Sequence, residues 1–455
     1  MMIKFFAAAM IALFQLMFFS CDSLFDSSSE GTTEVIPVKE KPAPQIPKWT
    51  FIVYMAADNN LESAAISDLN EMEEASSFLF ENTILVLLDR ASGYDATNGD
   101  WNDTRLFRVS GDSSVPQSVL TSERLSCPEL GLSADSETEL DMANKETLSN
   151  LLAFARREYK AEHYALIVWG HGNGWRGELE NKAFAADSFS DSCMSICDLR
   201  MALDEGMDGS VLDFVGFDTC FGNCLELCYE LSSSAQFLAG TPALVPSGGW
   251  NYTELFSSFA ATSLDCEELS RCCSEQFKKS YSTYAHACFS VVNLQKLREA
   301  ALSFDSLMQS AADLVWDDSK AIAYSELCRK SVRSYCAADF PCDYFLDAKD
   351  FSKKIATVEP ALSDLCAAVS EDFDRALVSS WSADGAEISV AVFYSVFEAA
   401  GCPSCTHPPL YVNSSRETGQ CMFVSELCGY VPTALKKGSF LDKVFYKEIS
   451  NDSSF

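Results

Sequence analysis

Two segments of the chain place a chemically reactive side chain directly after a run of apolar residues. Residues 165–169 (ALIVW) lead into Gly170-His171-Gly172, and residues 214–217 (FVGF) lead into Asp218-Thr219-Cys220. A cysteine thiolate is a strong nucleophile, and an imidazole can hold or release a proton near neutral pH. A pair formed by His171 and Cys220 therefore predicts nucleophilic attack on a carbonyl carbon.

The choice of histidine is narrow because the sequence contains four, at positions 163, 171, 286 and 407. His163 precedes an apolar run and is expected to be exposed, His286 precedes another and is expected to be structural, and His407 lies in a segment rich in Pro and Cys. His171 alone follows an apolar run. The glycines beside it let backbone N–H groups approach a reacting carbonyl oxygen closely.

The position of Cys220 also favours reactivity. Apolar spacing predicts a helix over residues 223–232, so that Cys220 would lie at its positive amino end, where a thiolate is stabilised. The alternative is that Cys220 is a small hydrophobic residue of the core, which is the usual role of a buried cysteine. Cys224 and Cys228 follow Cys220 at helical spacing and are expected to pack in the core.

The elements that must position these residues alternate between strands and helices. Short apolar runs predict buried strands over 49–56, 83–88, 164–169, 212–217, 236–239 and 288–294. Helical spacing marks 61–76, 145–159, 223–232 and 267–281. This alternation predicts an α/β fold with a mostly parallel sheet and helices on both faces. Ligands of such sheets bind beyond the carboxyl ends of the strands, where His171 and Cys220 stand.

The composition excludes some classes of partner. The chain has 455 residues, 48% of them hydrophobic, and 66 acidic against 33 basic residues give a net charge of −33. Such a chain can build a large core, but its charge repels phosphate backbones and anionic lipid headgroups. We therefore expect no nucleic-acid partner.

The amino-terminal residues predict export. Residues 1–20 contain one charge, Lys4, and an apolar run over 5–19 that is too short to span a bilayer. Ser20-Cys21 resembles a bacterial lipoprotein processing site, at which Cys21 would be acylated; the alternative is a cleaved secretory signal with an ordinary cysteine. Residues 21–48, rich in Ser, Glu and Pro, read as a flexible linker. The expected location is the bacterial cell envelope, with the lipoprotein facing the periplasm or the cell surface.

Residues 164–175 and 213–220 are similar to the His and Cys signatures of the clostripain family of cysteine peptidases, relatives of caspases, legumains and gingipains. Residues 49–60 (WTFIVYMAADNN) resemble the family's first strand, and 246–250 (PSGGW) another family segment. The resemblance implies a caspase-like three-layer sandwich over residues 49–294. Residues 295–455 then form a largely helical C-terminal subdomain, with helices expected over 295–314, 321–333 and 348–369 and a strand over 387–393.

The resemblance also implies roles for individual residues. Cys220 would attack the peptide carbonyl and His171 would transfer the proton, while the N–H groups of Gly172 and Cys220 form the oxyanion hole. Asp218 would line the substrate pocket, although capping the next helix is an equally good role for it. Cleavage after Arg or Lys is the leading expectation. Residues 240–246 (GTPALVP) carry no acid, which departs from family members that prefer basic residues.

Further expectations concern metal binding, self-cleavage and other functions. No cofactor or metal is required; calcium enters only because some family members use it, and the oxygen-rich segment from Asp187 to Asp191 is one location for it. Arg176 and Lys182 are candidate self-cleavage sites. Cys402, Cys405 and His407 are expected to be disulfide-bonded or free rather than zinc-bound. Two other functions stay open: a catalytically silent surface-binding lipoprotein, and a serine esterase, which would need a G-x-S-x-G motif that the sequence lacks.

Overall fold

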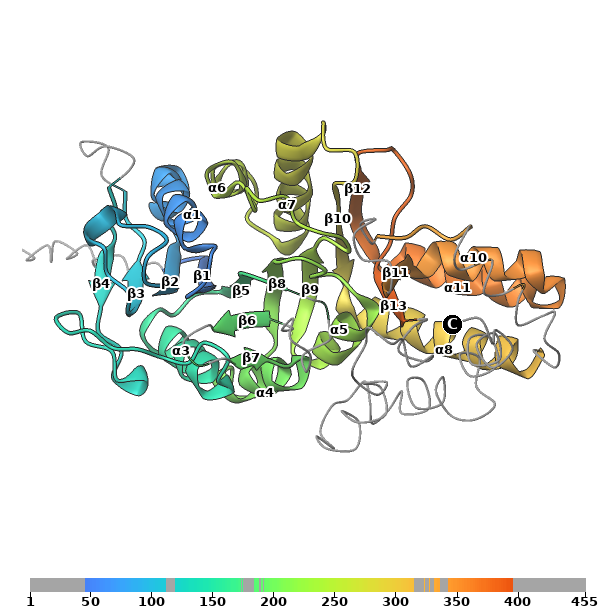
Figure 1. The fold of residues 1–455 in the computed structure, drawn as a ribbon, viewed down its shortest axis with the longest axis horizontal. Coiled ribbons are helices and arrows are strands. Elements are labelled where there is room, and N and C mark those ends of the chain that lie inside the picture. The colour runs from blue at the N-terminus through green and yellow to red at the C-terminus, as the bar shows by residue number, and fades with distance from the viewer. Residues whose placement is uncertain are drawn as a thin grey trace, which may run out of the picture. The chain divides into compact units, whose positions relative to one another are not determined.

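Strands β12-β10-β9-β8-β5-β1-β2-β3-β4, in this order, form the central sheet of the computed structural model (Figure 1). The strands are β1 (Trp49–Ala57), β2 (Thr83–Arg90), β3 (Thr104–Arg108), β4 (Glu123–Leu125), β5 (His163–Trp169), β8 (Leu212–Asp218), β9 (Ala235–Gly240), β10 (Cys288–Asn293) and β12 (Leu377–Ser382). From β2 through β1, β5 and β8 to β9 all neighbours are parallel. The strands outside this group pair antiparallel.

The structure describes residues 46–111, 119–172, 174, 184–187, 190, 192–314, 323, 327, 331–335 and 343–395. The chain divides into two units, residues 1–45 and residues 46–455, and all described residues belong to the second. Among them, no helix combines the length and the apolar character that crossing a bilayer would require.

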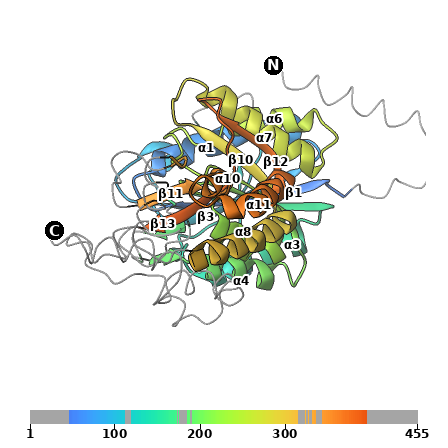
Figure 2. The same ribbon diagram turned by 90° about the vertical axis from the view of Figure 1, so that its right-hand side faces the viewer.

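Helices cover both faces of the sheet (Figures 1 and 2). Helices α1 (Glu62–Glu74), α2 (Ser76–Leu79), α6 (Tyr252–Ala260) and α7 (Cys266–Tyr281) lie on one face; α3 (Lys145–Glu158), α4 (Ile196–Gly206), α5 (Leu225–Glu230) and α8 (Leu294–Leu314) lie on the other. Each face encloses its own hydrophobic core. The predicted α/β fold with helices on both faces is confirmed.

Strand β1 shows why the apolar runs form buried strands. Side chains alternate between the two faces of a strand, and Phe51 and Val53 enter one core while Ile52 and Tyr54 enter the other. All nine residues of β1 are buried. A continuous apolar run is therefore what a central strand covered by helices on both sides requires.

The register of the parallel strands brings their carboxyl ends to one edge. Met55 of β1 pairs with Trp169 of β5, which pairs with Asp218 of β8, and Phe217 pairs with Gly240 of β9. Neighbouring strands lie about 4.8 Å apart. The segments that follow β1, β5, β8 and β9 are thus adjacent in space.

The part of the chain beyond residue 294 is not purely helical. It contributes β12 to the central sheet, and β11 (Asp343–Asp347) and β13 (Ala391–Ser395) pair in a separate two-stranded sheet, as do β6 (Phe184–Asp187) and β7 (Ser192–Met194). The single helix predicted over 348–369 is instead α10 (Ala348–Val358) and α11 (Ser363–Ala376), because Pro360 removes a backbone donor between them. Most of the helix predicted over 321–333 lies outside the described residues.

Candidate active site

His171 and Cys220 lie at equivalent positions beyond two adjacent strands. Trp169 ends β5, Asp218 ends β8, and these two residues are register partners; His171 and Cys220 each follow two residues later. The Gly170 N–H donates to the Asp218 carbonyl, with 3.3 Å between N and O, so the two segments remain paired past the strands. The structure brings the two predicted catalytic residues to the same edge of the sheet.

Gly172 presses against the backbone of the cysteine segment. A Cβ placed on Gly172 would lie 2.5 Å from the Cys220 carbonyl oxygen and 2.7 Å from the Thr219 Cβ, closer than real side chains approach. On its other side, Gly172 forms an isolated antiparallel bridge with Phe184. Only glycine therefore fits between the cysteine segment and Phe184.

The imidazole of His171 is oriented by Asn60. The His171 Nε2 lies 2.8 Å from the Asn60 Oδ1. Because a carbonyl oxygen only accepts hydrogen bonds, Nε2 carries the proton and Nδ1 has the free lone pair. The side chain is exposed, but partial desolvation by surrounding atoms lowers the pKa of His171 from its ordinary value of 6.5. His171 is therefore a neutral base with its Nδ1 available.

Asn60 is a site residue that the sequence reasoning missed. It stands in the turn after β1, next to His171 because β1 and β5 are neighbours. Asn59 fixes this turn: its Nδ2 donates to the Ala56 carbonyl at 3.0 Å, and its Oδ1 accepts from the Leu61 N–H at 3.0 Å. The signal that could have identified Asn60 is its place among polar residues at the carboxyl end of a central parallel strand.

The thiol of Cys220 is partly buried and contacts the segment after β9. The Val245 N–H donates to the Cys220 Sγ, with 3.4 Å between N and S. Burial raises the pKa of Cys220, the Val245 N–H opposes this rise, and Asp218 adds to it. The helix predicted over 223–232 is α5, which begins at Leu225, five residues after Cys220. The prediction that Cys220 lies at the amino end of this helix is wrong. The predicted stabilisation of the thiolate by that helix is therefore absent.

The residue after the nucleophile has an unusual backbone conformation. Phe221 has φ +52°, a left-handed conformation that costs about 1–3 kcal/mol for a non-glycine residue. Its N–H donates to the Ala243 carbonyl at 2.8 Å, and its ring stacks on Phe345 of β11, with centroids 4.1 Å apart and planes inclined by 12°. These contacts hold the strained turn that presents Cys220.

Strand β13 continues this support. Cys224 and Ala391 form an isolated parallel bridge, and the Ala391 N–H donates to the Asn223 carbonyl at 3.1 Å. Residues beyond position 294 thus support the nucleophile loop, residues 219–224, from one side, and the central sheet supports it from the other. Cys224 and Cys228 are buried core residues as predicted, whereas Cys220 is not on their helix.

Asp218 belongs to a buried acidic cluster. It accepts hydrogen bonds on Oδ2 from the Trp250 N–H and the Tyr252 hydroxyl, both at 3.0 Å, and its buried Oδ1 has no hydrogen-bond partner among the described residues. Burial raises its pKa to about 7. It does not cap α5, which begins after Cys224. The predicted capping role is therefore wrong.

A second aspartate lies beside Asp218. A Cβ placed on Gly249 would be 3.0 Å from the Asp218 Oδ2 and 3.4 Å from the Asp68 Oδ2, so both carboxyl groups face one point. Asp68, on α1, accepts from the Trp169 Nε1 at 2.7 Å, and burial together with the charge of Asp218 raises its pKa well above the ordinary value. Glu71 on the same helix contributes further repulsion. The sequence did not reveal this pair, which joins residues 150 positions apart.

The other histidines have different surroundings from those predicted. His163 begins β5 at the opposite end from the site, where its Nδ1 lies 2.9 Å from the Asp213 Oδ1. His286, predicted to be structural, is exposed and lines a cavity. Several predicted positions lie outside the described residues: Cys21, Arg176, Lys182, Asp191, Cys402, Cys405 and His407.

Three carboxylate residues could hold a metal ion within the described part of the chain. Asp58, Asp89 and Glu139 each offer an oxygen, and these oxygens lie within 4.8 Å of one another. Calcium prefers carboxylate and carbonyl oxygens, so this group fits that ion in its chemistry. The sequence analysis did not single out these residues.

The chain is similar to one family of known proteins. The family model for the clostripain family, Peptidase_C11, matches residues 53–398. Clostripain of Hathewaya histolytica is 25% identical over 240 residues, which are 47% of this chain and 42% of that protein; the match therefore spans less than half of this relative.

Two solved structures resemble the fold. One is a secreted C11 cysteine protease from Bacteroides thetaiotaomicron in complex with an irreversible peptide inhibitor, with TM-score 0.54, 20% identity and coverage of 76% of this chain and 89% of that one. The other is an inactive zymogen C11 protease from Parabacteroides distasonis, with TM-score 0.55, 20% identity and coverage of 75% and 85%. At this identity the likeness concerns the fold, and it agrees with the caspase-like sandwich expected from the sequence.

Proposed function

Because the chain belongs to the clostripain family, we propose that it is a cysteine endopeptidase that cleaves peptide bonds through a thioester on Cys220. The observation that carries this proposal is the convergence at the sheet edge. His171 is oriented by Asn60, Gly172 is pressed against the Cys220 carbonyl, and the Val245 N–H contacts the Cys220 sulfur. Nucleophile, base and backbone donors thus lie on adjacent segments, as acyl transfer requires.

The resting state holds a neutral thiol and a neutral imidazole. Burial raises the pKa of Cys220, and desolvation lowers the pKa of His171, so both shifts oppose a preformed ion pair. When a peptide carbonyl arrives, Cys220 attacks it and its proton passes to the Nδ1 of His171. The developing oxyanion is held by the N–H groups of Gly172 and Cys220. A single such donor contributes about 3–4 kcal/mol in a serine protease.

The second half of the reaction uses the same groups. Protonated His171 gives its proton to the leaving amine, which departs as the new amino terminus. The imidazole then takes a proton from water, and the hydroxide attacks the thioester and releases the carboxyl product. Throughout, the Asn60 carbonyl accepts from Nε2 and keeps the lone pair of Nδ1 directed at the reacting atoms.

We propose Arg or Lys as the residue before the scissile bond. Asp218 and Asp68 supply the acidic groups that residues 240–246 lack. Two facing carboxyl groups in a buried site are costly when both are ionised, and within the described part of the chain no donor reaches the Asp218 Oδ1. A guanidinium or ammonium group would supply both the missing positive charge and the missing donor.

We propose further that Cys21 is acylated and anchors the protein in the bacterial cell envelope. The support is the apolar run that ends at Ser20-Cys21 and the Ser- and Pro-rich residues that follow it. Incorporation of labelled palmitate into the protein in living cells tests this proposal. Loss of the label in Cys21→Ala is the expected result, and an unlabelled wild-type protein would contradict it.

Purified protein and its Cys220→Ala variant, incubated with a positional peptide library, test the main proposal. The expected result is cleavage after Arg or Lys by the wild type and none by the variant. Equal cleavage by both proteins would show that another component acts, and turnover only after apolar residues would overturn the proposed role of Asp218 and Asp68.

A further inference from the structure

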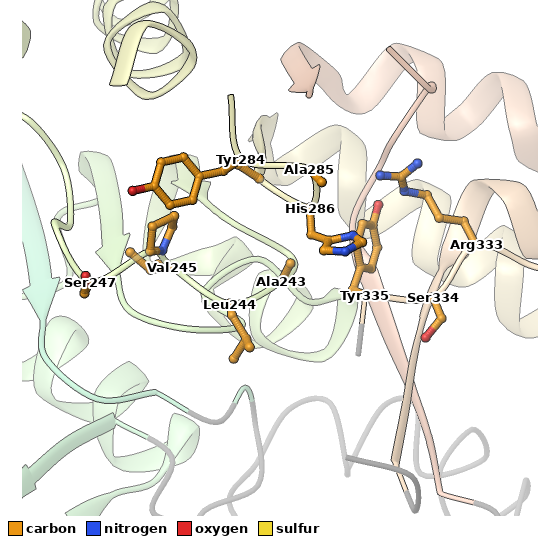
Figure 3. Close-up of a pocket in the computed structure, with 12 residues that line it drawn as sticks. Ala243, Leu244, Val245, Ser247, Tyr284, Ala285, His286, Arg333, Ser334 and Tyr335 are labelled. Carbon is orange, nitrogen blue, oxygen red and sulfur yellow. The ribbon is translucent and has the colours of Figure 1, made fainter. Parts of the chain in front are cut away.

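The cavity that His286 lines lies beside the segment that follows β9, and Figure 3 shows the side chains around it. Its volume is about 550 Å³, within the range of binding pockets. Three segments build it: residues 243–247 after β9, residues 284–287 before β10, and residues 333–335 before β11. Val245 belongs to its wall and also donates its N–H to the Cys220 Sγ. The cavity therefore shares the Val245 wall with the surroundings of the nucleophile.

The walls are fixed by hydrogen bonds. The Tyr335 N–H donates to the Phe345 carbonyl at 2.7 Å, and the Tyr335 hydroxyl donates to the Asp347 Oδ2 at 2.6 Å. Arg333 donates from Nη1 to the Asp384 Oδ2 at 2.8 Å and from Nη2 to the Ser382 Oγ at 2.9 Å. Because these side chains are already held in place, a ligand would not have to order them.

The lining is mainly apolar. None of its twelve described residues is Asp or Glu, and Arg333, the one arginine among them, is already paired with Asp384. Leu244 is 36% exposed and Tyr284 is 55% exposed, and in Figure 3 these side chains, together with Val245, lie on the opposite side of the cavity from Arg333 and Tyr335. Exposed apolar side chains around a concavity mark a binding surface. A lysine or arginine entering here would lose water and gain no carboxylate.

The sheet order determines which part of a peptide reaches this cavity. Strand β8, which carries Cys220, lies between β5, which carries His171, and β9, which leads to Val245. Since His171 must protonate the leaving amine, the leaving part of the peptide lies toward β5. The acyl part therefore lies toward β9 and β10, where the cavity is.

We propose that this cavity, the Tyr284 pocket, binds an apolar side chain of the substrate on the acyl side of the scissile bond and excludes lysine and arginine there. The inference rests on the proposed endopeptidase function and adds a second determinant of substrate choice. Asp218 and Asp68 would bind the positively charged side chain before the scissile bond. The Tyr284 pocket would bind an apolar side chain at a neighbouring position of the substrate.

Two readouts test the pocket separately from catalysis. The first is kcat/KM for peptides with Arg at the scissile position and Phe, Leu, Gly or Lys at each of the three preceding positions. The second is the Kd of the same labelled peptides for the Cys220→Ala protein, measured by fluorescence polarisation. At one position we expect Phe or Leu to give a kcat/KM about tenfold higher and a Kd about tenfold lower than Gly. Lys at that position should give a lower kcat/KM and a higher Kd than Gly.

Variants at the rim assign the effect to the pocket. Ala285→Trp fills the mouth of the cavity from an exposed position. It should bring the Phe-to-Gly ratio, which is the kcat/KM of the Phe peptide divided by that of the Gly peptide, close to one. Ser282→Trp adds the same bulk at an exposed position outside the lining and should leave the ratio unchanged. Leu244→Asp places a carboxylate at the rim and should make Lys bind better than Gly at that position.

The outcomes separate the two proposals. Side-chain-selective binding to Cys220→Ala that depends on Ala285, without turnover by the wild type, would support the pocket and refute the endopeptidase. Turnover with a Phe-to-Gly ratio that Ala285→Trp leaves unchanged, or with Lys accepted as well as Phe, would overturn the pocket. Neither binding nor turnover of any peptide would overturn both.

Discussion

Adding one methyl group at Gly172 perturbs the site without removing any reacting group. The Cβ of Gly172→Ala would lie 2.5 Å from the Cys220 carbonyl oxygen, whereas non-bonded carbon and oxygen atoms prefer about 3.3–3.6 Å. The two segments must therefore separate by about 1 Å. Phe184 holds Gly172 from the other side, so the shift falls on the nucleophile loop.

A displacement of about 1 Å at a reacting atom costs about 100-fold in rate, which corresponds to about 2.7 kcal/mol of transition-state stabilisation. We expect kcat to fall by this factor and KM to change little, because the substrate pockets are unaltered. Overpacking should also lower the free energy of unfolding by about 1–3 kcal/mol. The assay is steady-state hydrolysis of an Arg-terminated reporter peptide, together with urea unfolding.

Gly209→Ala is the matched control. Gly209 has φ +73°, and a Cβ there would meet no atom within 4 Å, so the substitution strains the backbone without moving the site. It should reduce stability and leave kcat unchanged. If Gly172→Ala retains kcat within about threefold of the wild type, the close approach of these segments does not position the nucleophile.

Three further substitutions have expected outcomes. Asn60→Ala should lower kcat about fivefold without changing KM, since one hydrogen bond worth about 1 kcal/mol no longer orients His171. Stopped-flow measurement of acylation tests this, and an unchanged acylation rate would refute the role of Asn60. Burial raises the pKa of Asp218 to about 7, so its carboxyl is neutral below that pH and ionised above. The kcat/KM for Arg substrates should therefore rise between about pH 6 and pH 8 relative to a matched neutral substrate. Glu71→Gln should move this rise to lower pH, because the charge of Glu71 contributes to the raised pKa of Asp218; parallel profiles of the two substrates would contradict this. Phe345→Ala removes a buried ring that stacks on the nucleophile loop and should lower the free energy of unfolding by about 3 kcal/mol. The midpoint of urea unfolding measures this change. A midpoint equal to that of the wild type would show that Phe345 does not stabilise the loop.

The sequence predicted the elements whose signal is local. Continuous apolar runs identified the central strands because helices cover both faces of the sheet, and glycines around His171 marked the close approach of two backbones. The helix expected at Cys220 does not begin there, because the turn at Phe221 is stabilised by Ala243 and Phe345, which are distant in the chain. The spacing of apolar residues within one segment does not reveal contacts with distant segments.

The remaining site residues come from pairings between distant segments. Asn60 meets His171 only through the pairing of β1 with β5, and Asp68 meets Asp218 across 150 residues through the packing of α1. A parallel sheet places the ends of strands together, but the sequence does not state the strand order. That order decides which polar turn lies beside which reactive residue.

Covalent labelling tests the central claim most directly, because the chain has 19 cysteines and the account assigns reactivity to one. The protein is treated with a peptidyl acyloxymethyl ketone ending in Arg and analysed by intact and tandem mass spectrometry. We expect one adduct per chain, on Cys220, and we expect it to form much more slowly in His171→Ala than in the wild type. An adduct on another cysteine, or an equal rate of labelling without His171, would contradict it.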